Sequence, residues 1–405
     1  MKTTKILGMA VLATVMASCS NDDPTVSMQK VDVSCTVPSE LSNLTLVKGQ
    51  VTLVNISTAT EYKSDITSLD MTGFSMAVPA GVYNVTFEAD VTYAVEGKTH
   101  EGKLRGYQEA VECVDGNMDL KIETQLLNTE GGLVIAEIFF TGTQTPENKQ
   151  YNGDKYFRIY NNSSDSINVA GYGIAESAFQ TVSKEDYTPN IMGESVAVQA
   201  LYVISKDAPR YLQPGESILI CDNAINHKDA NSNSFDLTGA DYEWYDESTN
   251  PNFLDVDNPK VPNLVKYYCY TATIWGPHNR GFHSYFLVDM NDTDKETFLA
   301  KNAYHYEWTF VFGDNSFPMD GDDYSIPNKN VVDAVNLSVE SDFQWIVTDP
   351  SLDMGWTYCG STTSDAGRYG YSVRRKTLTG STLVDTNNSE NDFKPMQEAD
   401  PFFKF

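Results

Sequence analysis

Residues 74–89 read Phe-Ser-Met-Ala-Val-Pro-Ala-Gly-Val-Tyr-Asn-Val-Thr-Phe-Glu-Ala, and this stretch predicts two β-strands joined by a tight turn. Pro79 presets φ for a turn position, and Gly81 tolerates the positive φ that many turns require. Elsewhere, many short runs of β-branched and aromatic residues are interrupted by Asn, Asp, Gly and Ser. Together these patterns indicate an all-β protein.

The flanking residues extend this pattern into a whole domain. Val31–Val37 alternates between apolar and polar residues with a period of two, as a half-buried strand does. Gln50–Asn55 predicts another strand, and Met118–Gln125 closes the unit with strict alternation. We therefore expect a small β-sandwich over residues 30–127. Its turn segment resembles the prealbumin-like and immunoglobulin-like modules of surface proteins, which implies a spacer role.

The N-terminus has the pattern of a lipoprotein signal peptide over residues 1–18. Lys2 and Lys5 precede an apolar run that is too short to span a hydrocarbon core of about 30 Å. Met16-Ala17-Ser18-Cys19 then forms a lipobox, so we expect Cys19 to become the N-terminus and to carry acyl chains such as palmitate. Two or more chains anchor a protein stably to a membrane. The alternative is a plain secretory signal in which Cys19 is accidental.

Residues 19–29 form a polar tether after the lipid site. The acids Asp22 and Asp23 in this tether resemble the surface-export signal of Bacteroidota lipoproteins. The resemblance implies that the protein is lipid-anchored in the outer membrane and faces the cell exterior. A periplasmic location remains the alternative.

The charge balance excludes one class of partner. The chain holds 28 basic and 56 acidic residues, and loss of Lys2 and Lys5 with the signal peptide changes the net charge from −28 to −30. Such a surface repels the phosphates of nucleic acids, so we expect no DNA or RNA partner. Anionic lipid headgroups are equally unattractive, which leaves anchoring to the acyl chains.

Five cysteines remain once Cys19 is assigned to the lipid. An oxidising envelope permits disulfides, and Cys35 and Cys113 lie in early and late strands of the first domain, so a bridge between them is one hypothesis. The odd count leaves at least one thiol unpaired within the chain. The pairing is otherwise open among Cys35, Cys113, Cys221, Cys269 and Cys359.

The second domain, residues 131–405, resembles the lamin-tail domain, an immunoglobulin-like sandwich. Glu137 matches the acid of that family's first strand motif, although Arg158 stands where many members have Glu. The other matching stretches are Tyr160-Asn161, Gly171, Pro214-Gly215, Asn330–Val335, Tyr371–Arg375 and Asp385–Phe393. The whole arrangement resembles an uncharacterised family of Bacteroidota lipoproteins. Arg374 and Arg375 stand out in so acidic a chain, and we expect one of them to pair with a carboxylate at the core edge.

Residues of about 226–325 have no counterpart in a minimal lamin-tail domain, so we expect them to form a large insert. Asp294–Tyr306 is the best candidate for a short helix, with Phe298 on its apolar face, and Trp308–Phe312 predicts a strand. Long loops with this much aromatic surface are more often functional than accidental.

Motifs of catalysis are missing from the sequence. It contains no GxSxG elbow, HExxH or P-loop, and no Cys/His cluster with the ligand spacing of zinc. His278 and His283 could bind a metal or an anion, or could simply flank a turn. The acidic turns Asp289–Glu296 and Asp320–Asp323 could hold calcium weakly but lack the pattern of an EF-hand, so we expect no metal and no cofactor.

Ligand recognition is the remaining possibility. Sugars are often bound on aromatic platforms beside polar groups, because a sugar has an apolar face and polar edges. Trp244 and Trp356 are flanked by loop residues, which makes them the candidates for an exposed ligand-binding role. Trp275, Trp308 and Trp345 lie in strand-like runs and are expected in the core.

The sequence therefore predicts an all-β protein with two β-sandwich domains and a non-enzymatic binding role at the cell surface. By analogy with envelope relatives, the first hypothesis is an accessory lipoprotein that captures a glycan or other nutrient beside a TonB-dependent transporter. The alternatives are a structural or fimbria-associated adhesion protein and a carbohydrate-active hydrolase, which would need converging carboxylates.

Overall fold

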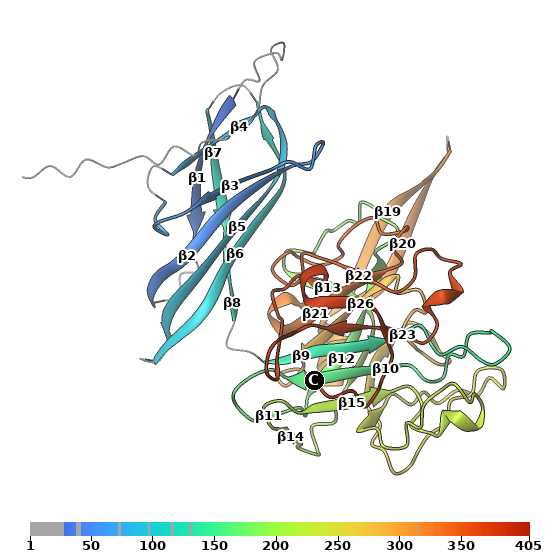
Figure 1. Ribbon diagram of the computed structural model, residues 1–405. Helices are drawn as coiled ribbons and strands as arrows, with labels where there is room; N and C mark the ends of the chain where they lie inside the picture. The colour runs from blue at the N-terminus through green and yellow to red at the C-terminus, as the bar shows by residue number, and fades with distance from the viewer. Residues whose placement is uncertain are drawn as a thin grey trace, which may run out of the picture.

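The structure is a computed structural model that describes residues 28–37, 42–71, 74–95, 98–114, 117–128, 132–313 and 315–405. The predicted signal peptide 1–18, the lipidation candidate Cys19 and residues 20–27 of the predicted tether lie outside the described residues. The protein is all-β with two β-sandwiches, one at each end of the molecule in Figure 1. No helix within the described residues is long and apolar enough to cross a membrane.

The N-terminal sandwich packs a three-stranded sheet, β4-β1-β7, against a five-stranded sheet, β3-β2-β5-β6-β8. Its strands are β1 (Met28–Thr36), β2 (Ser42–Asn55), β3 (Glu61–Asp65), β4 (Ser75–Pro79), β5 (Gly81–Val95), β6 (Lys98–Cys113), β7 (Asn117–Glu123) and β8 (Gln125–Asn128). The predicted strand–turn–strand at 74–89 is confirmed, and its turn carries the chain from one sheet to the other. The alternating residues of both sheets, Val31, Val78, Phe87 and Leu104 among them, are fully buried between them.

The C-terminal sandwich has a six-stranded sheet of order β16-β15-β10-β9-β23-β26. These strands are β9 (Leu133–Phe139), β10 (Tyr156–Asn161), β15 (Ser217–Cys221), β16 (Tyr242–Glu243), β23 (Tyr371–Arg375) and β26 (Phe393–Glu398). An eight-stranded sheet of order β19-β20-β13-β12-β18-β21-β22, with β17 also paired to β13, faces it. Its strands are β12 (Tyr172–Gln180), β13 (Ser195–Val203), β17 (Val265–Cys269), β18 (His283–Asp289), β19 (Ala303–Phe312), β20 (Asn315–Pro327), β21 (Val331–Ser338) and β22 (Thr357–Tyr358).

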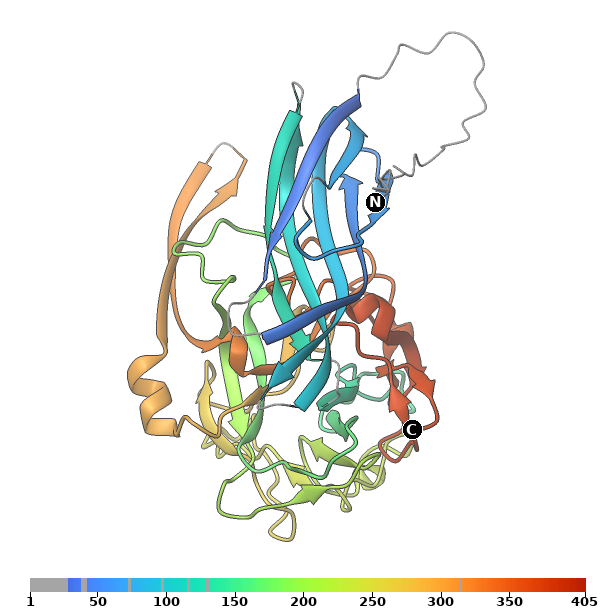
Figure 2. The same ribbon diagram turned by 90° about the vertical axis from the view of Figure 1, so that its left-hand side faces the viewer.

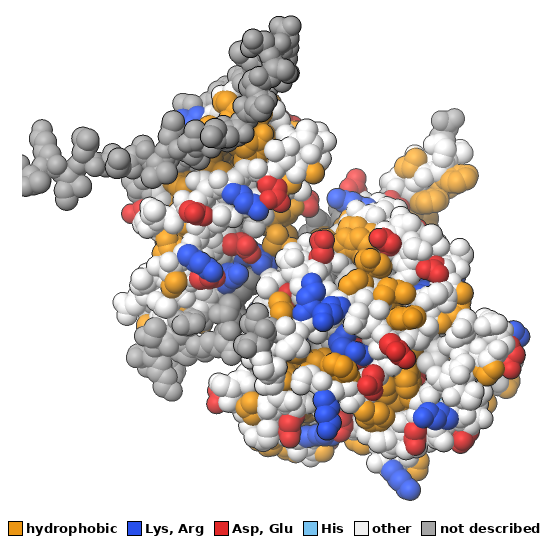
Figure 3. All heavy atoms as spheres, viewed as in Figure 1, with side chains coloured by type: hydrophobic (Ala, Val, Ile, Leu, Met, Phe, Trp, Pro, Cys, Tyr) orange, Lys and Arg blue, Asp and Glu red, His pale blue; other side chains and the backbone are white. Residues whose placement is uncertain are grey.

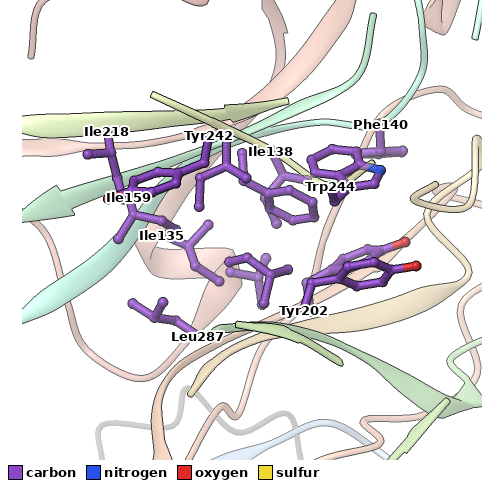
Figure 4. Close-up of a cluster of buried hydrophobic side chains, with 14 of the residues drawn as sticks. Ile135, Ile138, Phe140, Ile159, Tyr202, Ile218, Tyr242, Trp244 and Leu287 are labelled. Atoms are coloured by element: carbon purple, nitrogen blue, oxygen red, sulfur yellow. The ribbon is translucent and has the colours of Figure 1, made fainter. Parts of the chain in front are cut away.

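The core of this second sandwich is continuous between the two sheets. Ile135 and Ile159 point down from one sheet and Leu287 and Tyr202 point up from the other, as Figure 4 shows. The remaining short elements lie around this core. They are β11 (Ile167–Asn168), β14 (Tyr211–Leu212), β24 (Thr377–Thr379), β25 (Thr382–Leu383), α1 (Lys295–Lys301), α2 (Ser389–Asp392) and three 3-10 turns at 227–229, 328–330 and 366–368.

The stretch 226–325, which we expected to be a large insert, contributes strands to the sandwich. Its strand β18 lies between β12 and β21 near the middle of the eight-stranded sheet, so this part belongs to the sandwich itself. The helix predicted over 294–306 forms only as α1, with Phe298 fully buried and Asp294 as N-cap. It ends because Tyr304 and Tyr306 belong to the alternating pattern of β19.

The predicted Cys35–Cys113 disulfide is also corrected. All five cysteines of the described residues are free thiols. Cys35 lies in β1 and Cys113 at the end of β6, in different sheets. The Cys35 thiol contacts the Leu69 carbonyl at 3.5 Å, and the Cys113 sulfur lies 3.8 Å from that of Met118. Burial raises the pKa of both thiols, which disfavours the reactive thiolate.

Both arginines of the Tyr371–Arg375 strand pair with buried acids. Arg374 contacts the buried carboxylate of Glu137 at 3.0 Å, and Arg375 contacts Asp333 at 2.5 Å. Arg375 also lies 3.3 Å from Asp385 and from Asp392. These contacts confirm the expected arginine–carboxylate pairing, and they tie β9, β21 and β23 together at the edge of the core.

Arg105 connects the two sandwiches. It is only 4% exposed, it pairs with Glu88 of β5 at 2.7 Å, and it donates to the backbone carbonyls of Thr386 (2.6 Å) and Asn387 (3.1 Å). A buried guanidinium needs such acceptors, because an unsatisfied buried charge is costly. The N-terminal unit is therefore held against the loop that precedes α2.

Candidate binding site

The long hairpin β19–β20 projects beyond the sandwich to which it belongs, as Figures 1 and 2 show. In β19, every second residue is aromatic, and because side chains alternate along a strand these rings share one face. We call this set the aromatic stripe: Tyr304, Tyr306, Trp308, Phe310 and Phe312. Met319 and Phe317 of β20 lie directly opposite Trp308 and Phe310 and extend the same face.

The inner half of the aromatic stripe is covered. Phe179 of β12 stacks on Tyr187 with ring centroids 3.8 Å apart, and both contact Tyr306 edge-on at 5.1 and 5.6 Å. Trp345 extends this layer and donates its ring N–H to the Gln180 carbonyl at 2.8 Å. Aromatic pairs of this geometry each contribute about 0.5–1.5 kcal/mol beyond their area burial. The base of the hairpin is therefore fixed to the body.

The outer half of the stripe is open to solvent. Exposure rises from 6% at Tyr304 and 8% at Tyr306 to 43% at Phe310 and 72% at Phe312. On β20, Phe317 opposite Phe310 and Met319 opposite Trp308 are 46% and 41% exposed. Figure 3 shows hydrophobic side chains at the hairpin tip. Contiguous exposed apolar surface of this kind marks an interaction site on a soluble protein.

The opposite face of the hairpin is polar and acidic. His305 lies 2.9 Å from Asp322 across the two strands, and Glu307 lies opposite Asp320. We call Glu307, Asp320 and Asp322 the acidic face. The hydrogen bond with Asp322 raises the pKa of His305. The inner half of the hairpin thus has an aromatic side and an acidic side, and further out the acidic side gives way to Thr309, Val311, Ser316 and Pro318.

Two hollows adjoin the hairpin and share Glu185, Trp308 and Met319. The smaller one, about 430 Å³, is lined by Tyr306, Trp308 and Phe310 of the aromatic stripe, by Phe179 and Tyr187, and by Ala178, Gln180, Ser183, Glu185 and Met319. The larger one, about 930 Å³, is bordered by Lys184–Asp186 and Thr188 and by the hairpin residues Glu307, Trp308, Thr309, Val311, Pro318, Met319 and Asp320. Volumes of this size are typical of ligand sites. Trp308 lies between a hollow rich in aromatic rings and a hollow rich in carboxylates.

The outer edge of β19 is partly paired. Thr188 and Glu307 exchange two backbone hydrogen bonds of 2.9 Å, so the odd-numbered residues of β19 direct their N–H and C=O groups outward. Thr309 and Val311 follow with the same orientation, and within the described residues no backbone hydrogen bond reaches their outward groups. An unpaired strand edge is a template for another strand.

Asp323 lies where the hairpin joins the body. It accepts hydrogen bonds from the hydroxyls of Tyr306 (2.9 Å) and Tyr268 (3.3 Å). Burial raises the pKa of Asp323 to about 6, although these two hydrogen bonds act in the opposite direction. The carboxyl group therefore changes charge in a mildly acidic range.

Trp244, a predicted ligand-binding residue, is corrected to a core residue. It is 0% exposed, because its ring packs edge-on against Phe157 (5.8 Å) and Trp275 (5.3 Å) in the sandwich core. Its ring N–H donates to the Trp275 carbonyl. Trp244 directly follows β16, the edge strand of the six-stranded sheet. From this position its ring points into the core, although the neighbouring residues in the sequence are polar.

Trp356 is half-buried and keeps some access to solvent. Phe343 stacks on it in parallel at 4.4 Å, and Tyr358 lies 5.6 Å away. One face of the Trp356 ring is therefore already occupied. The two predicted tryptophans are not brought together, and neither borders the hairpin hollows.

The predicted histidine and acidic candidates do not form a metal centre. His283 is buried and contacts the Ser177 carbonyl, while His278 stacks on Phe282, and burial lowers the pKa of His278 to about 3. Asp289 instead accepts from Asn291, and Asp320–Asp323 belongs to β20. In the part of the chain that the structure describes, no three His, Cys, Asp or Glu side chains are grouped to hold a metal ion.

The alternating pattern of the first hairpin strand was recognised only in part, because the prediction covered Trp308–Phe312 and not the residues before it. The predicted strand Trp308–Phe312 is confirmed within β19, but Trp308 is half-exposed rather than a core residue. Alternation of aromatic residues with His, Glu and Thr over 303–312 predicts a two-faced strand. The alternation does not say which part of the aromatic side is covered.

Comparisons with known proteins bear on the fold. Residues 213–400, which include the hairpin, match a family described as "Protein of unknown function (DUF4876)". A crystal structure of a DUF4876 family protein from Bacteroides thetaiotaomicron is similar to this chain, with a TM-score of 0.50 and 21% identity, over 92% of this chain and 95% of that one. Among curated proteins, none matches. The similarity to an uncharacterised family agrees with our expectation, and the lamin-tail resemblance stays a prediction.

Proposed function

We propose that this protein is a non-enzymatic binding protein, anchored by lipid at Cys19 and facing the cell exterior, whose working surface is the outer half of hairpin β19–β20. One observation carries the proposal: the aromatic stripe leaves a well-packed base and becomes progressively exposed, up to 72% at Phe312. Burying such rings is favourable by about 25 cal/mol per Å² of apolar surface, so a partner gains most by covering them.

A protein partner suits this surface better than a small nutrient alone. The hairpin offers apolar rings, an acidic face and an unpaired strand edge within one segment, and only a polypeptide satisfies all three. An accessory lipoprotein that docks on an outer-membrane TonB-dependent transporter for nutrient capture therefore remains the first proposal. Direct glycan capture would use Trp308, which borders both hollows.

A structural or adhesion role is the second candidate, and the open edge of β19 favours it. Surface proteins that assemble by strand addition need such an edge. Both candidates place the contact on the same hairpin, and they differ in the identity of the partner.

The proposal is tested by site-specific photo-crosslinking in living cells. A photoreactive phenylalanine replaces Phe312 in the full chain, and in a control it replaces Tyr211, which is 62% exposed on β14. We expect one discrete protein adduct from position 312 and none from position 211. Excess purified wild-type protein should prevent the adduct. Equal labelling from both positions would mean that the hairpin is not the working surface.

A further inference from the structure

The larger hollow beside the hairpin has the features of a slot for an additional β-strand. It is bordered by the unpaired edge at Thr309 and Val311 and by the segment Lys184–Asp186. Thr188, two residues after that segment, already pairs antiparallel with Glu307. On this outer edge of β19 a single bridge at Glu307 is therefore followed by Thr309 and Val311, whose outward backbone groups are unpaired within the described residues.

We propose that an extended segment of a partner protein, with alternating basic and apolar residues, adds antiparallel to β19 at Thr309 and Val311. This inference rests on the proposed function and names the chemistry of its partner. Each outward residue of β19 offers one N–H and one C=O, so the two residues offer two donors and two acceptors.

The chemistry of the occupant follows from the two faces of the hairpin. In an antiparallel pair, directly opposite residues share a face of the sheet. Partner residues opposite Thr309 and Val311 would lie on the side of Glu307 and Asp320, which favours Lys or Arg. The partner residues that alternate with these would lie on the side of Trp308 and Phe310, which favours apolar side chains. The slot lining holds Glu185, Asp186, Glu307 and Asp320 against one cation, Lys184.

Charge disfavours two other occupants. The chain's own tether carries Asp22 and Asp23 and no basic residue between Cys19 and Ser27. A second copy of this chain would bring a net charge of −28 and another acidic face against the first. A basic segment of a different protein meets no such repulsion.

Synthetic peptides of about eight alternating Lys and Val residues test this inference, with binding to the full-length protein measured by fluorescence anisotropy. In the proposed geometry the Lys N–H groups point at β19 and the Val N–H groups point away. N-methylation of the Lys residues should therefore weaken binding by about tenfold or more, whereas N-methylation of the Val residues should leave it within about twofold. A Glu–Val peptide should not bind.

A matched pair of protein variants gives an independent readout. Thr309→Pro removes an outward N–H without breaking the β19–β20 ladder and should weaken Lys–Val binding by about tenfold, while Thr309→Val should not. Circular dichroism checks that both variants are folded. Equal binding of the two N-methylated peptides, or no binding of the Lys–Val peptide to wild type, would overturn strand addition. Photo-crosslinking from Phe312 reports on the binding surface separately, so the two failures are distinguishable.

Discussion

Gly321 of β20 lies directly opposite Tyr306 of β19, and the tyrosine ring occupies the space that a side chain at 321 would need. A Cβ built on Gly321 would lie 2.5 Å from Cζ of Tyr306. From this position the Tyr306 hydroxyl reaches Asp323 at 2.9 Å. The absence of a side chain at Gly321 thus leaves room for the ring of Tyr306, which is the last ring in the buried half of the aromatic stripe.

Replacement of Gly321 by Ala should therefore destabilise the protein. We expect a loss of about 1–3 kcal/mol in the free energy of unfolding, because the Tyr306 ring must leave its layer. Urea unfolding of both variants measures the effect. The control is Gly239→Ala, where an added Cβ meets nothing within 4 Å and we expect little change. Equal stability of the two variants would contradict the packing described for Tyr306.

The charge of Asp323 should make stability depend on pH in a defined window. Its pKa in the fold is about 6, above the ordinary value near 4. Between these values the folded state holds a proton that the unfolded state has released, so stability falls as pH rises from about 4 to about 6. Above that range the contribution is constant.

Asp323→Asn should remove this part of the pH dependence. Unfolding free energies of wild type and variant, measured from about pH 4 to pH 8, give a difference curve that isolates Asp323. We expect the stability of wild type relative to the variant to decrease across the window and then to level off. A flat difference curve would show that Asp323 titrates normally.

Arg105 should control the orientation of the two sandwiches. Arg105→Ala removes its donations to Thr386 and Asn387 and leaves Glu88 without its buried partner. We expect faster hydrogen exchange around residues 384–388 and a larger radius of gyration in X-ray scattering. Lys103→Ala, which removes a contact of 3.7 Å to Asp90 within the N-terminal sheet, is the control and should change neither. Unchanged scattering for Arg105→Ala would assign the orientation to other contacts.

Lipid anchoring remains a prediction from the lipobox and is tested apart from the fold. Cys19→Ala should abolish incorporation of labelled palmitate and release the protein from the membrane fraction, because the chain of net charge −28 has no attraction for anionic headgroups. Cys35→Ala is the matched control and should remain membrane-bound. Membrane partition of Cys19→Ala equal to wild type would exclude the lipid anchor.

Local sequence patterns predicted individual strands better than they predicted how those strands pair into sheets. The alternation in Val31–Val37 and the turn chemistry at Pro79 correctly predicted strands, because they depend on neighbouring residues. The position of β18 in the sheet depends on its pairing with β12 and β21, which no local pattern encodes. For this reason the sequence did not predict that part of residues 226–325 lies within the sheet.

The candidate site was harder to predict for the same reason. Trp244 lies among polar residues in the sequence, yet the chain after β16 turns its ring into the core between Phe157 and Trp275. Trp308 has the pattern of a core strand, yet Tyr187 of the Phe179–Tyr187 layer covers it only in part, with ring centroids 5.6 Å apart. Exposure of an aromatic residue depends on where its covering layer stops, and that layer comes from distant segments.

We propose that the exposed half of the aromatic stripe is the binding surface. The most direct test is saturable binding of labelled, purified protein to cells that lack their own copy, for wild type, for Phe310→Ser with Phe312→Ser, and for Tyr211→Ser. We predict that the double variant loses about tenfold or more in affinity while its folding is unchanged, and that Tyr211→Ser binds as wild type does. Equal affinity of the double variant and wild type would show that these rings are not the binding surface.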